Sequence, residues 1–159
     1  AVGFLNAAVV ASGVGNKATA QLWIDKLEAL DQDILGKAAK DTMFNDIDYD
    51  MPGTAVLCQV LSIAGATELS VEIADAEMRK ALRERSTDGY WIYCRTLSRV
   101  LRESGNEVKS NLVLQEGSEV LQKEAQKALK AGQAQKTKDL QWKANYLKAV
   151  MDSNGQFRW

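Results

Sequence analysis

The chain has 159 residues, of which 46% are hydrophobic and 26% are charged, and this composition is typical of a folded globular protein rather than a disordered one. Its formal net charge of -1 argues against a protein that binds nucleic acid through a basic surface. The sequence contains no histidine, which excludes catalytic triads and zinc centres that depend on this residue.

With one proline and 11 glycines, the chain has few of the turn-forming residues that a loop-rich β fold needs, so we expect an all-α protein. The length is enough for one domain that buries about 70% of its unfolded surface. We therefore predict a single helical domain over residues 1–159, with a docking segment at residues 1–15 and a tail at residues 153–159. No stretch is apolar over enough residues to predict a membrane span.

The first predicted helix covers residues 3–12 and ends at the glycines that follow it. Its apolar side chains are expected to dock onto a larger body, either the rest of this chain or a neighbouring subunit. The candidate docking residues in this segment are Phe4, Leu5 and Val9.

From Lys17 to about Asp41 the apolar residues recur at spacings of three and four, which predicts one amphipathic helix. The loop after it carries aspartates at three alternate positions between residues 46 and 50, like the start of a calcium-binding loop. Met51 stands where such a loop needs glycine, and Leu57 where it needs glutamate. We therefore predict a solvated acidic loop and no metal site.

Residues 54–64 are apolar nearly all round, which predicts a central, surrounded helix, with a buried strand as the alternative. Residues 68–85 continue as a helix. After a turn at residues 86–89, the next helix carries its apolar residues on one side and ends at Gly105.

The last third of the chain, residues 107–151, lacks proline and is rich in residues that favour helix, so we predict one long helix there. Its apolar residues form two stripes that are out of phase, and the second stripe begins at Leu140. Either the helix breaks near Gly132, or it continues through a solvated middle. Together these elements predict an antiparallel bundle of four to five helices without an internal repeat.

The two cysteines, Cys58 and Cys94, are predicted to be buried thiols, with a disulfide as the alternative. Lysines concentrate between residues 123 and 148, and acidic residues between 25 and 50. Pairing of the acidic helix with the basic one explains this segregation as well as a nucleic-acid surface does, so no nucleic-acid partner is expected.

Three arginines, Arg95, Arg99 and Arg102, fall on one stripe of their helix, opposite its apolar residues. Arginine pairs with carboxylates through two parallel hydrogen bonds, so this stripe is a candidate docking face for an acidic partner. The alternative is a solvated helix face whose arginines pair with local acidic residues such as Glu103.

Aromatic residues supply the other candidates for partner binding, since Trp91, Trp142 and Trp159 are at positions that need not all be core. Trp91 lies in a run with more apolar surface than one stripe can bury, which is typical of an interface anchor, although a helix inside a bundle would show the same pattern. Phe157 and Trp159 in the tail complete the set.

The sequence contains no arrangement of residues that indicates catalysis, and the glycine-rich loops that bind phosphate are absent. We therefore expect neither an enzyme nor a cofactor or metal. The sequence predicts a non-catalytic structural or accessory subunit that docks into a larger protein assembly through its terminal segments and aromatic surface. The alternative is a helical binding module that captures an acidic ligand or partner through the arginine stripe. Nothing in the sequence indicates a cellular compartment.

Overall fold

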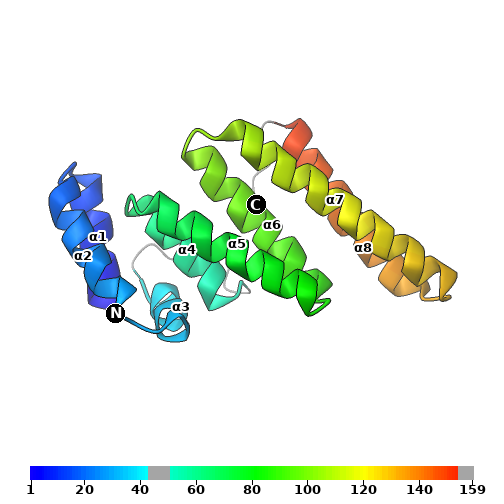
Figure 1. The fold of residues 1–159 in the computed structure, drawn as a ribbon, viewed down its shortest axis with the longest axis horizontal. Coiled ribbons are helices and arrows are strands. Elements are labelled where there is room, and N and C mark those ends of the chain that lie inside the picture. The colour runs from blue at the N-terminus through cyan, green and yellow to red at the C-terminus, as the bar shows by residue number, and fades with distance from the viewer. Residues whose placement is uncertain (43–50, 154–159) are drawn as a thin grey trace. The chain divides into compact units, whose positions relative to one another are not determined.

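The structure, a computed structural model, describes residues 1–42 and 51–153. Within these residues it contains eight α-helices and no strands, and the helices form antiparallel pairs (Figure 1). The all-α prediction is confirmed. The predicted number of helices, four to five, is too small. Part of the difference arises because residues 17–41 and residues 107–151 each form two helices.

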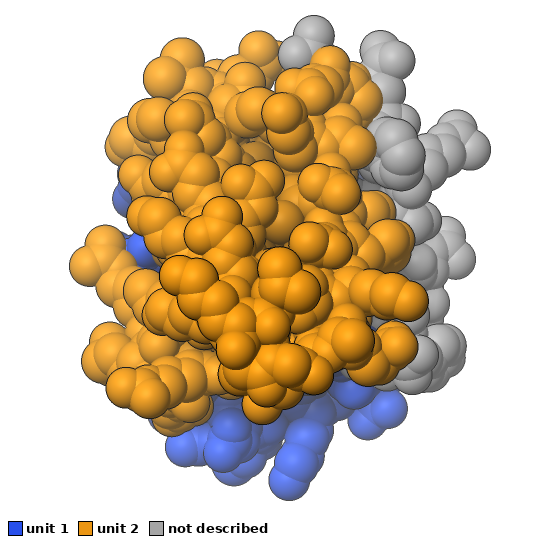
Figure 2. All heavy atoms as spheres, turned by 90° about the vertical axis from the view of Figure 1, so that its right-hand side faces the viewer, with its two compact units in different colours: residues 1–75 blue, residues 76–159 orange. Residues whose placement is uncertain are grey.

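The chain divides by its contacts into two units, residues 1–75 and residues 76–159 (Figure 2). The helices of the first unit are α1 (Val2–Gly13), α2 (Lys17–Glu28), α3 (Gln32–Lys40) and α4 (Gly53–Ile63). Helix α5 (Thr67–Arg83) holds residues of both units, and the second unit continues with α6 (Thr87–Glu103), α7 (Glu107–Lys130) and α8 (Ala134–Asp152). The expectation of a single domain stays a prediction.

The predicted helix over residues 17–41 is two helices because Asp31 caps the second one. Its carboxylate accepts hydrogen bonds from the backbone N–H groups of Asp33 at 2.8 Å and Ile34 at 3.4 Å. A cap of this kind satisfies backbone donors at the start of a helix, so α3 begins at Gln32. The new helix leaves Ile34 55% exposed, although Ile34 is one of the apolar residues whose spacing of three and four over residues 17–41 predicted a buried stripe.

The long C-terminal helix is broken at Gly132, which was one of the two outcomes that the sequence left open. Gly132 has a φ of 70°, a left-handed conformation that glycine adopts without steric strain. Helices α7 and α8 then pack against each other as an antiparallel pair. The two out-of-phase stripes therefore meet, since Leu121 of α7 and Leu140 of α8 belong to one core cluster.

Five turns between successive helices share one geometry. In each, a residue with a left-handed φ is followed by a residue whose backbone N–H donates to the carbonyl five residues earlier, at 2.8 to 2.9 Å. The left-handed residues are Gly15, Gly65, Arg85, Gly105 and Gly132. The sequence does not show this as a repeat because the helices between the turns differ in number and in length, from 9 residues in α3 to 24 in α7.

In the first unit, α4 is a surrounded helix, as predicted. Every residue from Ala55 to Leu61 is buried, and α4 packs against α3 and α1. Helix α1 packs against α2, and it buries Leu5, Ala8 and Val9. The first unit therefore has an apolar core built around α4 and α1.

In the second unit, α7 packs against both α6 and α8. Gly117 of α7 lies between them, and a methyl group added there would come within 2.9 Å of the Cys94 sulfur and of Leu147. Cys94 and Cys58 are both buried and neither forms a disulfide, which confirms the prediction of buried thiols.

Candidate functional site

Three aromatic rings from two helices meet on the second unit. The turn at Gly132 returns α8 alongside α7, and Trp142 and Tyr146 of α8 contact Trp91 of α6. The ring centroids lie 5.6 Å apart for Trp91 and Trp142, 5.8 Å for Trp91 and Tyr146, and 5.6 Å for Trp142 and Tyr146. The rings are tilted or edge-on to one another, which is the arrangement that aromatic pairs prefer.

Arg95 joins these rings from the next turn of α6. Its guanidinium carbon lies 4.3 Å from the centroid of Trp91 and 5.4 Å from that of Tyr146. Residues four apart on a helix lie on one face, so the α6 backbone places Arg95 next to Trp91. A cation over an aromatic face is stabilising by about 0.5 to 2 kcal/mol. We refer to Trp91, Arg95, Trp142 and Tyr146 as the aromatic–arginine cluster.

A lysine at the edge of this cluster connects α8 to the start of α6. The ammonium of Lys143 donates hydrogen bonds to Asp139, at 2.6 Å, and to Asp88. Burial of the side chain opposes the charged form, but the hydrogen bonds that Lys143 donates to Asp139 and Asp88 outweigh it, so the pKa of Lys143 is raised. The resulting ion pair between α8 and α6 helps to hold the rings of the two helices in contact.

The cluster is open to solvent on the α8 side. Trp142 is 55% exposed, and Trp91 and Tyr146 are half-buried. The indole N–H of Trp91 is buried and has no hydrogen-bond acceptor among the residues that the structure describes. Contact with the neighbouring rings therefore holds the Trp91 side chain in position. A large, exposed aromatic residue that is held rigidly by its neighbours is typical of an interface anchor.

The cluster is a contact surface rather than a cage for a small cation. An aromatic cage needs rings that are spread around an empty centre. Here the three rings touch one another, and Arg95 already covers the face of Trp91.

The other two arginines of the predicted stripe have polar partners of their own. The Nε of Arg99 donates to Glu103 at 2.9 Å, and Arg102 donates to Asn111 of α7 at 2.8 Å. Glu103 is thus a local acidic partner of Arg99, as predicted by the alternative interpretation of this stripe as a solvated helix face. Arg95, Arg99 and Arg102 therefore each have a different partner: Trp91, Glu103 and Asn111.

The candidate residues of the N-terminal segment lie in the first unit. Leu5 is 0% exposed and Val9 is 4% exposed, so both belong to the core of that unit. Phe4 is half-buried and stacks on Trp23 of α2 with a centroid distance of 5.3 Å. Docking by residues 1–15 stays a prediction, but Leu5 and Val9 contribute to the chain's own interior. Phe157, Trp159 and the three aspartates between residues 46 and 50 lie outside the described residues.

Comparison with models of protein families, with curated proteins and with solved structures finds no match to this chain. In the part of the chain that the structure describes, no group of three or more Cys, Asp or Glu side chains is placed to hold a metal ion. Over the same residues, no helix has both the length and the apolar character needed to cross a membrane.

Sequence reasoning noted that Trp142 need not be a core residue, but it did not place Trp142, Lys143 or Tyr146 among the partner-binding residues. Trp142 and Tyr146 are four residues apart and lie off the apolar stripe of Leu140, Ala144 and Leu147. Two aromatic residues at helical spacing outside the buried stripe are the signal that could have identified this surface.

Proposed function

We propose that this chain is a non-catalytic interaction subunit that docks onto a partner protein through the aromatic–arginine cluster. The observation that supports this proposal most directly is the position of Trp142, which is 55% exposed although two neighbouring rings hold it in place. A rigid aromatic side chain loses little conformational entropy when a partner covers it, so it can contribute strongly to binding.

The composition of the cluster also supports docking to a protein. Tryptophan, tyrosine and arginine are the residues most enriched among those that dominate binding energy at protein interfaces. The cluster combines all three, and the ion pair of Lys143 with Asp88 and Asp139 fixes the helices that carry them. We expect the partner to cover Trp142 and Tyr146 with apolar side chains.

The proposal is tested by site-specific photo-crosslinking in native extract. A photo-reactive aromatic amino acid is introduced in place of Trp142, and a matched variant carries it in place of Val108. Val108 is a suitable control because it is 74% exposed on α7 and lies outside the cluster. We expect a discrete crosslinked partner from position 142 that is absent from position 108.

Co-purification with the Trp142→Ala variant provides the second measurement. Trp142 is largely exposed, so its truncation should leave the fold intact, which circular dichroism checks. We expect the crosslinked partner to co-purify with the wild type and with Val108→Ala, and to be lost with Trp142→Ala. Equal crosslinking from both positions, or equal co-purification with Trp142→Ala, would contradict the proposal.

A further inference from the structure

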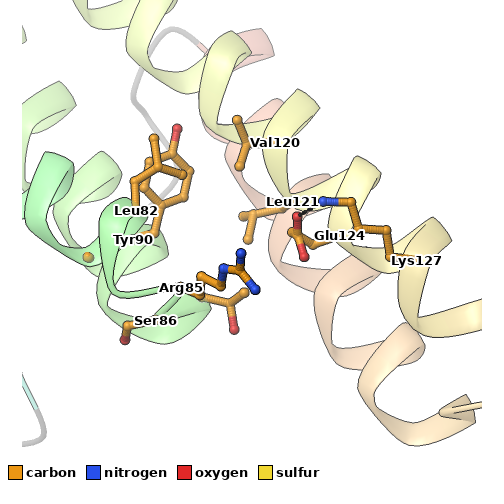
Figure 3. A pocket seen from close by; sticks show the side chains of 10 residues that line it. Leu82, Arg85, Ser86, Tyr90, Val120, Leu121, Glu124 and Lys127 are labelled. Atoms are coloured by element: carbon orange, nitrogen blue, oxygen red, sulfur yellow. Dashed lines mark hydrogen bonds and ion pairs between the residues drawn. The ribbon is translucent and has the colours of Figure 1, made fainter. Parts of the chain in front are cut away.

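A groove lies elsewhere in the second unit, between the turn that joins α5 to α6 and the middle of α7. It has a volume of about 350 Å³, at the small end of the range of about 300 to 1,000 Å³ typical of ligand pockets. Leu82, Tyr90 and Val120 give it an apolar wall, and Arg85, Glu124 and Lys127 lie around it (Figure 3). The groove therefore has room for one or two apolar side chains.

Arg85 occupies a strained backbone position in the wall of this groove. Its φ is 57°, and in the described residues it is the only non-glycine residue with a positive φ. The four other turns of this geometry carry glycine at the equivalent position, and a non-glycine residue there costs about 1 to 2 kcal/mol. Strained residues of this kind cluster at functional sites, so we expect the side chain of Arg85 to have a functional role.

That side chain extends into the groove. Figure 3 shows it reaching from the turn toward Leu121 and Glu124 of α7. The nearby ammonium of Lys127 is paired with Glu124 at 2.6 Å, whereas Arg85 makes no ion pair within residues 1–42 and 51–153. Its guanidinium is therefore available for an anionic group that enters from outside.

The surroundings of the groove carry a positive charge. A second hollow continues along α7 from Val120 and is lined by Lys123, Lys127 and Lys130. Among the residues that line the two hollows, Arg85 and these three lysines stand against one carboxylate, that of Glu124. Such a surface attracts an acidic partner and disfavours a basic one.

We propose that this groove binds a segment of a partner protein that carries a bulky apolar residue flanked by aspartate or glutamate. The apolar side chain would contact Leu82, Tyr90 and Val120, and a flanking carboxylate would accept hydrogen bonds from Arg85. This proposal deepens the proposed function, because both describe an interaction subunit, but it involves none of the residues of the aromatic–arginine cluster.

The proposal is tested by NMR titration of the full 15N-labelled chain with an acetylated peptide, Asp-Glu-Leu-Phe-Glu-Asp. We expect saturable shifts of amides in residues 82–90 and 120–127. A peptide with serine in place of Leu-Phe, and one with amides in place of the carboxylates, should each bind more weakly. Inorganic phosphate serves as a probe for binding of an anion alone.

Arg85→Gly is the decisive variant because glycine adopts a left-handed φ readily, so the turn is kept while the guanidinium is removed. We expect it to weaken peptide binding by about fivefold or more, the change expected on loss of a charge-assisted hydrogen bond. Arg83→Ala is the matched control, since Arg83 is an exposed arginine on α5 outside the groove lining. It should bind the peptide within about twofold of wild type.

Three results would overturn the proposal: no saturable shift at millimolar peptide, equal binding by Arg85→Gly and wild type, or the same shifts with phosphate alone. Trp142→Ala separates the two sites. It should retain peptide binding, so failure of the groove and failure of the aromatic–arginine cluster give different results.

Discussion

Gly36 and Gly53 meet backbone to backbone where α3 packs against α4. A methyl group on Gly36 would lie 2.9 Å from the carbonyl carbon of Gly53, and one on Gly53 would lie 2.6 Å from the carbonyl oxygen of Gly36. Both distances are shorter than van der Waals contact, and the opposing atoms belong to the backbone, which cannot turn aside as a side chain can. Glycine at both positions is therefore what permits this close approach.

Replacing Gly36 with alanine should destabilise the first unit by about 1 to 3 kcal/mol, the usual range for overpacking a core. Urea unfolding followed by far-UV circular dichroism measures this change. Gly3→Ala is the matched control, because Gly3 is also in a helix but has no atoms within 4 Å of the added methyl group. Equal free energies of unfolding for the two variants would contradict the close packing of α3 against α4 at Gly36.

The turn at Gly105 gives a second prediction about backbone conformation. Gly105 has a φ of 79° and open space around it, so Gly105→Ala tests the left-handed conformation without a steric clash. We expect a loss of about 1 kcal/mol in the free energy of unfolding. Gly13→Ala also adds a methyl group in open space, but Gly13 lacks a positive φ, so this control should be neutral or slightly stabilising.

The ion pair of Lys143 predicts a dependence of stability on alkaline pH. The pKa of Lys143 is raised above its ordinary value of 10.5, so the stabilisation is complete below pH 10.5 and is lost as the pH rises through the folded-state pKa. Lys143→Met should therefore be less stable than wild type at neutral pH, by about 1 kcal/mol or less. The difference should shrink when urea unfolding is repeated above pH 10.5, and a difference that stays constant would contradict the prediction.

Cys94 predicts a separate effect at alkaline pH. Burial raises the pKa of Cys94 from 9.0 to about 12, so between these values the unfolded chain loses the thiol proton and the folded chain keeps it. Stability contributed by the neutral thiol is complete below pH 9.0 and falls as the pH rises, by about 1.4 kcal/mol per pH unit. Cys94→Ala should show a shallower slope than wild type in urea unfolding across the same pH range, because the contribution of Lys143 above pH 10.5 is kept.

The control for Cys94→Ala is Val100→Ala, which also removes buried atoms from α6. Val100→Ala should lower the free energy of unfolding through the cavity it leaves, while keeping the alkaline slope of the wild type. A slope that is equal in all three proteins would show that the Cys94 thiol does not couple to folding.

Local patterns in the sequence were sufficient to predict helices and several of their buried faces. Tyr90, Cys94, Leu97 and Leu101 recur at spacings of three and four and are all buried, because helical periodicity depends on neighbours within a few residues. Gly105 ends α6 as predicted, since the left-handed conformation after a helix is most easily adopted by glycine. Composition alone excluded every site that requires histidine, because the chain contains none.

Tertiary structure decided where two long periodic stretches divide and which distant faces meet. The cap at Asp31 competes with a continuous helix, and the fold selects the cap because α3 then packs on α4 through Gly36 and Gly53. Trp91 and Tyr146 are 55 positions apart in the sequence, so their contact depends on the turn at Gly132 and on the packing of α8. Periodicity assigns a face to each helix, but the partner of that face is set by packing between elements far apart in the chain.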